Sequence, residues 1–363
     1  MAGPTPSDEE IFRRIAASRG QPVDDLDLPQ GDRQNFAALS ARARDLIESA
    51  RRAVTGIPEI HFGFVRNATI NAFAAKSDGR YFVGVHTGVA ALLRLLTGRM
   101  LADPGLFPLI GDPSRERADL PRIAFYAPHA DQMLASEDLV MPCDPLRQAY
   151  MDHLVDRALM FFVGHEIAHI ANGHVDYLRE GRGLSALEED DGTPVDDERL
   201  LERRVLEFDA DRRSIMASVN SLRDTQFAPG FEGMAWGEGA DDAATMFRDW
   251  SAAISILFRM FGDPALADTR RAQAYPPLLV RWQSALAHAR YGIDRFWPGA
   301  QHAAALEALA EGRREVARAF ATIAGNSAPE VLPTAPPPDY LDGLQNYWND
   351  VLLERVRPYA YEF

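Results

Sequence analysis

Cysteine is almost absent from this chain of 363 residues. The single cysteine, Cys143, cannot form an intrachain disulfide bond, and no sequence signature of a thiol nucleophile surrounds it. The N-terminal stretch MAGPTPSDEEIFRRIAAS carries charges where a secretory signal peptide needs an apolar segment. We therefore expect a cytoplasmic protein with an inert thiol.

Long apolar runs and an excess of positive charge are also missing. Apolar stretches such as SAAISILF at 251–258 fall well short of the ~20 residues that cross a bilayer. The formal net charge of -15 leaves no basic stripe that could neutralise a phosphate backbone. We expect neither a membrane span nor a nucleic-acid partner.

The chain does have ample material for a buried core, with 47% hydrophobic residues. Helical spacing of apolar residues predicts helices over 33–55, 88–96, 145–172, 198–222, 240–261, 276–291, 299–324 and 344–356. Aromatic and β-branched runs bounded by turn residues predict strands at 60–65, 68–75, 81–85 and 122–127. The pattern favours a mainly α-helical α+β fold with a small antiparallel sheet.

Composition also suggests where the chain divides. We predict an N-terminal helical segment at 1–58, a core at 59–222 with an irregular insertion at 102–150, a helical continuation of that core at 223–326, and a Pro-rich linker with a C-terminal segment at 327–363. The acidic, Gly- and Pro-punctuated stretch at 179–199 is interpreted as a solvated connection.

One predicted helix carries the sequence GHEIAHIANGH. His165 and His169 are four residues apart and therefore project from one helix face, with Glu166 beside them. Two neutral imidazoles and a carboxylate suit zinc and leave a position for water, whose proton the glutamate can accept. The alternative is that these residues match the HExxH pattern by chance on a buried helix. The HExxH spacing favours the zinc site over this alternative.

A later helix carries EFDAD and supplies the third ligand. Glu207 can complete the zinc site, and Asp211, four residues on, can reach the outer nitrogen of a ligand histidine. Asp209 points elsewhere on this helix, and an ordinary acidic helix surface is the alternative. We expect the sheet to cover the HExxH helix and the glutamate helix to pack against it.

Other histidines have no partner at ligand spacing. His174 follows Gly173 and is interpreted as a helix-end packing or capping residue in preference to a ligand. His86 precedes the helix at 88–96, where a surface histidine is expected, although a contact with substrate stays open.

These motifs resemble the gluzincin peptidases of the CAAX prenyl endopeptidase and HtpX-like type. The resemblance rests on HExxHxxxGH followed by ExDAD, on NAFA and YFVGVHTGV after residue 70, and on YPPLLVRW at 275–282. It implies that His165, His169 and Glu207 bind zinc and that Glu166 is the general base. It also implies that Asp211 contacts a ligand histidine from outside and that Arg281 faces the site. It also implies that an edge strand containing Asn71, Ala72, Phe73 and Ala74 pairs with an extended substrate.

The chain departs from that family in several ways. Tyr275 stands where the family usually has histidine, although a phenol could still donate a hydrogen bond to an oxyanion. Nothing corresponds to the family's membrane helices, and 102–150 is an insertion. A looser resemblance, based on the zinc motif and the lack of a membrane span, is to phage-exclusion peptidases of the Lit type.

The sequence thus predicts a zinc-dependent endopeptidase with one Zn²⁺ per chain and a protein or peptide substrate. Two alternatives stay open: a host-defence effector peptidase specific for one folded protein, and a zinc-stabilised regulatory module without turnover. The presence of Glu166 argues against the module, because zinc binding does not require that residue.

Overall fold

The computed structural model describes most of the chain. The described residues are 6–23, 30–123, 134, 139–182, 186–188, 197–224, 243–261, 276–297, 300–324 and 338–361. Within these ranges, no helix combines the length and the apolar content needed to cross a membrane.

Helices dominate these residues, as predicted. They are α1 (Asp8–Ala16), α2 (Gln30–Ala53), α3 (Thr87–Leu101), α5 (Pro145–Ala171), α6 (His174–Arg182), α7 (Asp197–Asp224), α8 (Ala243–Met260), α9 (Leu278–Phe296), α10 (Ala300–Ala324), α11 (Pro338–Tyr347) and α12 (Leu353–Val356), with a short π-helix, η5 (Trp348–Leu352), before α12. Seven of the predicted helices are found, with bounds shifted by up to five residues, whereas the segment predicted as one helix at 344–356 contains the end of α11, the π-helix η5 and α12. Helices α1 and α6 lie outside the predicted ones.

The sheet contains β1 (Gln21–Pro22), β2 (Ile60–Arg66), β3 (Ala72–Ser77), β4 (Arg80–His86) and β5 (Ala186–Glu188), in the spatial order β1-β2-β4-β3-β5. Strands β3 and β4 form a hairpin whose turn residues, Asp78 and Gly79, have φ angles of 51° and 77°. An Asp-Gly pair is typical of such turns because both positions need positive φ. The turn between the predicted strands at 68–75 and 81–85 is therefore limited to Asp78 and Gly79, because Lys76 and Ser77 belong to β3.

The sheet is mixed, so the prediction of an antiparallel sheet was wrong for one pair of strands. Strand β2 runs parallel to β4, with Phe62 opposite Val83, whereas the other neighbours are antiparallel. The reason is the position of β4 between β2 and β3. As the return strand of the hairpin with β3, it runs in the same direction as β2.

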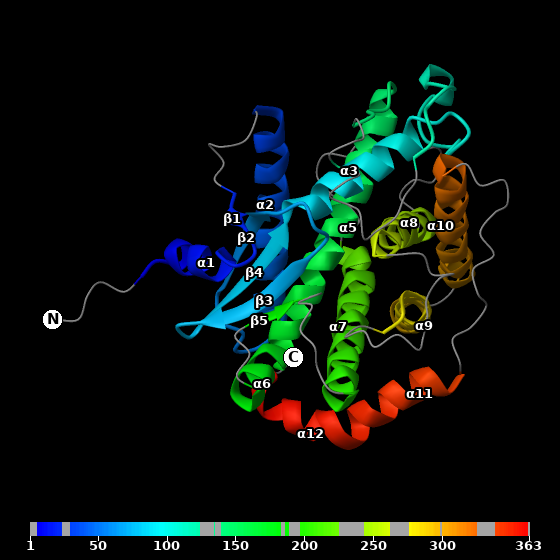
Figure 1. The fold of residues 1–363 in the computed structure, drawn as a ribbon. Helices are drawn as coiled ribbons and strands as arrows, with labels where there is room; N and C mark the ends of the chain where they lie inside the picture. The colour runs from blue at the N-terminus through cyan, green and yellow to red at the C-terminus, as the bar shows by residue number, and fades with distance from the viewer. Residues whose placement is uncertain are drawn as a thin grey trace.

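The two faces of the sheet pack against different helices. Ala72 and Ala74 belong to the main core, which also contains buried side chains of α3, α5 and α8. Phe73 belongs to a separate cluster with Ile11 and Phe12 of α1. This alternation follows from the period of two along a strand. Figure 1 shows α5 passing behind the sheet, with α7 beside it and α8 to α10 beyond.

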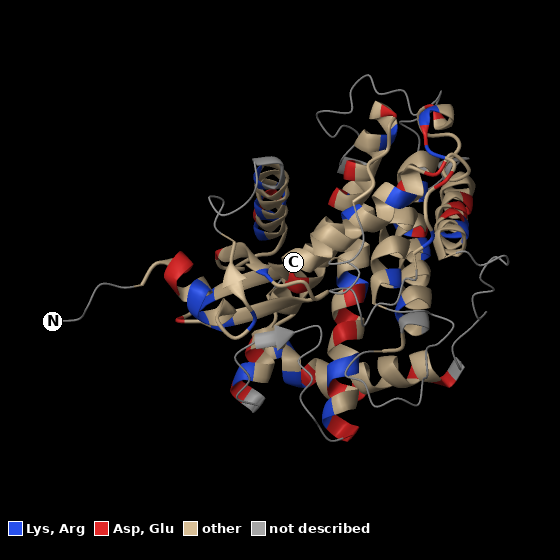
Figure 2. Ribbon diagram, turned by 45° about the horizontal axis from the view of Figure 1, so that its top comes forward, with Lys and Arg blue, Asp and Glu red and all other residues tan. Residues whose placement is uncertain are grey.

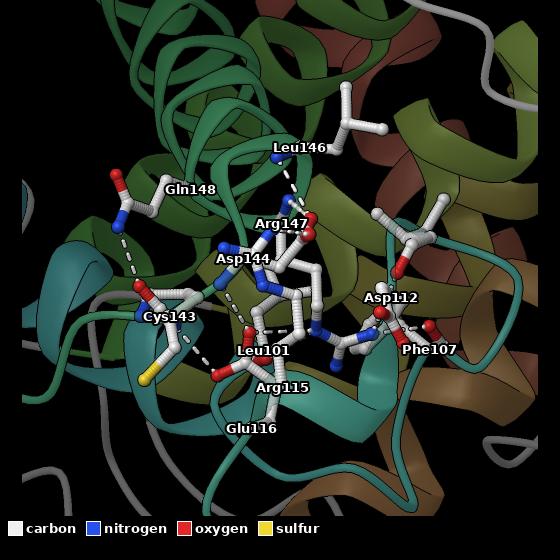
Figure 3. A network of polar contacts seen from close by, with 12 residues as sticks. Leu101, Phe107, Asp112, Arg115, Glu116, Cys143, Asp144, Leu146, Arg147 and Gln148 are labelled. Atoms are coloured by element: carbon white, nitrogen blue, oxygen red, sulfur yellow. Dashed lines mark hydrogen bonds and ion pairs between the residues drawn. The ribbon is translucent and has the colours of Figure 1, made fainter.

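The start of α5 is fixed by a buried polar network (Figure 3). Arg147, with no exposed surface, donates hydrogen bonds to backbone carbonyls that include Leu101 at the end of α3 and Phe107. The carboxylate of Glu116 accepts from the backbone N–H groups of Cys143 and Asp144. The carbonyls that a helix end leaves unpaired are thereby satisfied, and the segment after α3 is anchored to α5.

Two predictions about the connecting segments were wrong in part. Arg122 and Ile123 belong to no strand, and the remainder of the predicted strand at 122–127 lies outside the described residues. In the segment 179–199, expected to be a solvated connection, α6 continues to Arg182 and β5 joins the sheet.

The C-terminal helices pack on the core and do not stand apart from it. Leu344, Trp348 and Leu352 share a buried cluster with Tyr177 of α6 and Phe208 of α7. Figure 1 shows this segment, in red, running beneath α6 and α7. Charged residues of both signs are interspersed along the helices, whereas the strands are largely uncharged (Figure 2).

Candidate metal centre

Helices α5 and α7 bring three predicted ligands together. The Nε2 atoms of His165 and His169 lie 3.0 Å apart. Glu207 places Oε2 3.1 Å from Nε2 of His165 and Oε1 3.4 Å from Nε2 of His169. All three side chains are buried. The expected group of two imidazoles and one carboxylate is therefore present in the fold.

The donor set fits a zinc ion. Ligand atoms held at roughly 2.0–2.1 Å in tetrahedral geometry are about 3.3 Å from one another, close to the separations of 3.0 to 3.4 Å between these atoms. The three ligand atoms lie within 4.8 Å of one another. Both imidazoles turn the same nitrogen toward the carboxylate, so their lone pairs can converge on a cation.

The outer nitrogen of His165 faces a carboxylate, as predicted. Nδ1 of His165 lies 2.9 Å from Oδ1 of Asp211. Asp211 also accepts two hydrogen bonds from Arg281, at 2.8 and 3.0 Å. Burial alone would raise the pKa of Asp211, but Arg281 and His165 outweigh it and lower the pKa. Asp211 is therefore ionised and can fix the tautomer of His165.

Arg281 does not have the role that the resemblance implies. Its guanidinium forms a paired contact with Asp211 and is only 5% exposed. The resemblance implies that Arg281 faces the site, whereas in the structure Arg281 contacts the far side of the carboxylate that faces His165. Its contribution is to hold Asp211 in position.

The outer nitrogen of His169 faces another histidine, which sequence reasoning missed. Nδ1 of His169 lies 2.9 Å from Nδ1 of His174, and Nε2 of His174 lies 3.3 Å from Asp209. His174 is completely buried. The assignment of His174 as a packing residue was therefore incomplete. So was the expectation that Asp209 points away from the site.

The signal for this contact was Gly173. Its φ of 80° ends α5 and turns the chain, so that His174 begins α6 beside the preceding turn. A side chain at this position would meet the backbone of Tyr359 at 2.5 Å. On a continuous straight helix, His174 would not share a face with His169.

Burial and charge act differently on the three ligands. Burial lowers the pKa of His169 to about 4, which keeps this imidazole neutral. For Glu207, burial favours the acid, but His169 and His165 outweigh it and lower the pKa. For His165, burial opposes the charged form, but Asp211 and Glu207 raise its pKa well above the usual value. A proton and a metal cation thus compete for the position beside Glu207.

The predicted edge strand is not a free edge. Strand β5 pairs with β3 on the side away from β4, with Ala74 opposite Leu187 and Phe73 opposite Glu188. Asn71, Ala72, Phe73 and Ala74 are all buried. The position that an extended substrate was expected to take is filled by the chain's own strand.

Of the residues Glu166 and Tyr275, both expected to act in catalysis, the structure describes only Glu166. Glu166 follows His165 on α5 and is 1% exposed, so it lies in the protein interior. Tyr275 lies outside the described residues.

Comparison with known proteins gives no relative. No protein-family description, no curated protein and no solved structure matches the chain. What supports a function is therefore the motif and the arrangement of these side chains.

Proposed function

We propose that this protein is a zinc-dependent endopeptidase. The observation that carries the proposal is the buried convergence of His165, His169 and Glu207, with Glu166 directly after the first ligand on the same helix. A structural metal site commonly has four protein ligands, whereas a group of three leaves a position for a reactant. Among the described residues, this is the only such group of metal-binding side chains.

Zinc bound by these three residues would polarise a peptide carbonyl and lower the pKa of an attacking water. Glu166 is the general base, accepting the proton of the water and passing it to the leaving amine. Asp211 and His174 hold the two ligand imidazoles by their outer nitrogens. The low exposure of the site strengthens electrostatic interactions there.

A narrow substrate range fits the structure better than general proteolysis. Glu166 is 1% exposed, and the edge of β3 is taken by β5. Both features work against open binding of any extended peptide. They favour the second candidate, a peptidase that acts on one folded protein, over a housekeeping peptidase.

The decisive variant is Glu166→Gln, which keeps the size of the side chain but cannot accept the proton. Turnover should fall by at least about a hundredfold, because general-base assistance is worth ~10²- to 10⁴-fold. Zinc content and melting temperature should stay near those of the wild type. The measurement is kcat/KM, with zinc analysis, on the substrate found among casein, denatured lysate and folded lysate.

The matched control is Glu307→Gln on α10, an exposed glutamate that should leave the rate unchanged. A Glu166→Gln protein that retains more than about a tenth of the activity would exclude Glu166 as the base. If zinc is bound but none of the three preparations is cleaved, the non-catalytic module becomes the better explanation.

A further inference from the structure

A cavity of about 780 Å³ lies beside α7, between the end of α5, α9 and the C-terminal segment. Neither the three candidate ligands nor Glu166 lines it. Its α7 residues Asp209, Arg213 and Met216 project from a different helix face than Glu207. The volume is within the range of roughly 300–1,000 Å³ that is usual for small-molecule sites. The cavity is therefore separate from the three candidate ligands, although its wall includes Asp209, which contacts His174.

The charge of its lining is opposite to that of the chain. Arg212, Arg213 and Arg357 line the cavity, with Asp209 as the single carboxylate, in a chain of net charge -15. Asp209 is 2% exposed and is already contacted by His174 and by Arg212, the latter at 2.5 Å. Arg357 lies 3.7 Å from the exposed carboxylate of Glu354, which does not line the cavity. The lining itself thus keeps a positive excess, which suits an anion.

Arg213 is the most desolvated of these guanidinium groups. Burial lowers the pKa of Arg213 to about 10, so the group is still charged at neutral pH but has lost hydration. One of its nitrogens donates to Oδ1 of Asn172. A guanidinium has five N–H donors in a planar fork that matches the oxygens of a phosphate.

The remaining walls are aromatic and apolar. Trp348, Tyr291 and His288 line the cavity together with Met216 and Val356. Burial is the main cause that lowers the pKa of His288, which keeps its ring neutral. Aromatic side chains provide faces on which a planar ring can stack.

We propose that this cavity binds a phosphorylated ligand with a planar ring, of the nucleoside monophosphate class. The phosphate lies among Arg212, Arg213 and Arg357, and the ring contacts the wall that contains Tyr291 and Trp348. Binding at this cavity does not depend on the proposed peptidase activity.

The test is calorimetric titration of the full chain with three probes: adenosine 5′-monophosphate, adenosine and inorganic phosphate. The nucleotide should bind at least about tenfold more tightly than either part alone, because both walls are then used. Arg357→Gln and Tyr291→Ala should each weaken nucleotide binding at least about fivefold. Arg357 and Tyr291 are 74% and 56% exposed, so neither change threatens the fold.

Arg355→Gln is the matched control, since Arg355 is exposed on the same segment but does not line the cavity. It should leave the affinity unchanged. The proposal is overturned if the nucleotide gives no binding up to about 5 mM, which corresponds to negligible affinity. It is equally overturned if inorganic phosphate binds as tightly as the nucleotide, or if Arg355→Gln weakens binding as much as Arg357→Gln.

Discussion

The two candidate histidine ligands are supported by different chemical groups. His165 faces the ionised carboxylate of Asp211, whereas His169 faces the imidazole of His174, which in turn faces Asp209. A carboxylate accepts a hydrogen bond whatever its rotation, but an imidazole must present the correct nitrogen and tautomer. Asp209 determines that tautomer. The support of His169 is therefore the more easily disturbed of the two.

Replacing His174 tests this support directly. His174→Phe should raise the dissociation constant for zinc by about 10- to 100-fold, the usual effect of losing the partner of a ligand histidine. His174→Gln, which can still accept or donate a hydrogen bond, should recover part of that affinity. Competition with a chromophoric chelator gives the constants, and circular dichroism monitors the fold. Equal zinc affinity in the wild type and both variants would mean that His174 only fills space.

His86 is buried and not a surface residue, contrary to the sequence-based expectation. It is 3% exposed, and Nδ1 lies 2.8 Å from Oγ1 of Thr69. Burial, with a smaller effect of Arg19, lowers its pKa to about 4. The neutral imidazole is thus the form that the fold accepts, and His86 begins α3 as its N-cap residue.

This burial predicts a loss of stability in acid. Because the folded pKa is below the unfolded one, the unfolded chain binds the proton more readily as pH falls from 6.5 to about 4. The free energy of unfolding should therefore fall by about 3 kcal/mol between pH 6.5 and about 4 because of His86. Below about pH 4, His86 should cause no further loss. Urea titrations between pH 7.5 and 4 should show a shallower pH dependence for His86→Gln. Parallel curves for variant and wild type would contradict the assignment.

At the scale of elements, β5 is the feature with the clearest functional consequence. It is antiparallel to β3 and has only three residues, so its pairing with the edge is weak. An extended substrate that uses the same edge must displace β5. Strand β5 and the substrate then compete for β3. The apparent affinity for substrate equals the intrinsic affinity multiplied by the fraction of molecules in which β5 has left the edge.

Leu187→Pro tests this competition, because proline removes an N–H from β5. If substrate uses the edge of β3, the variant should lower KM at least about threefold with little change in kcat. Leu187→Ala keeps the N–H and serves as the control. The measurement is steady-state kinetics on a cleaved peptide. A KM that is unchanged or higher, with an intact fold, would show that substrate binds elsewhere.

In the whole molecule, the three candidate ligands come from the two helices α5 and α7. These helices contact different parts of the fold. Helix α5 packs against the sheet and α3, while α7 packs against α9 and the C-terminal segment. His165 and His169 come from α5, and Glu207 comes from α7. A bound cation would therefore link both parts.

Metal removal should consequently lower global stability. A ligand that binds only the folded chain stabilises it by about 4 kcal/mol when its free concentration is a thousand times its dissociation constant. Chelation should lower the Tm of the wild type by several degrees, and added zinc should restore it. Glu207→Ala should show a much smaller response to zinc, whereas His302→Ala, which removes a partly exposed histidine from its pair with Asp294, should respond like the wild type. A wild-type Tm that is insensitive to zinc would exclude the metal site.

Local structure and the three candidate ligands could be predicted from the amino-acid sequence alone. Apolar periodicity fixed the helices, and the Asp78–Gly79 pair fixed the hairpin turn. The spacing of His165 and His169 required both to share one face of α5, because a helix repeats every 3.6 residues. Glu207 could be chosen because its helix offers a second carboxylate, Asp211, one turn later.

The groups that contact the outer nitrogens of these histidines, and the strand that covers the edge of β3, could not be predicted before the fold was known. His174 reaches His169 because the chain turns at Gly173, and Arg281 reaches Asp211 across 70 residues of sequence. The parallel pairing of β2 with β4 and the docking of β5 on β3 join distant segments in the same way. Such contacts depend on how elements pack in space. The apolar periodicity of one segment indicates its own secondary structure and buried face, but not which distant segment it contacts.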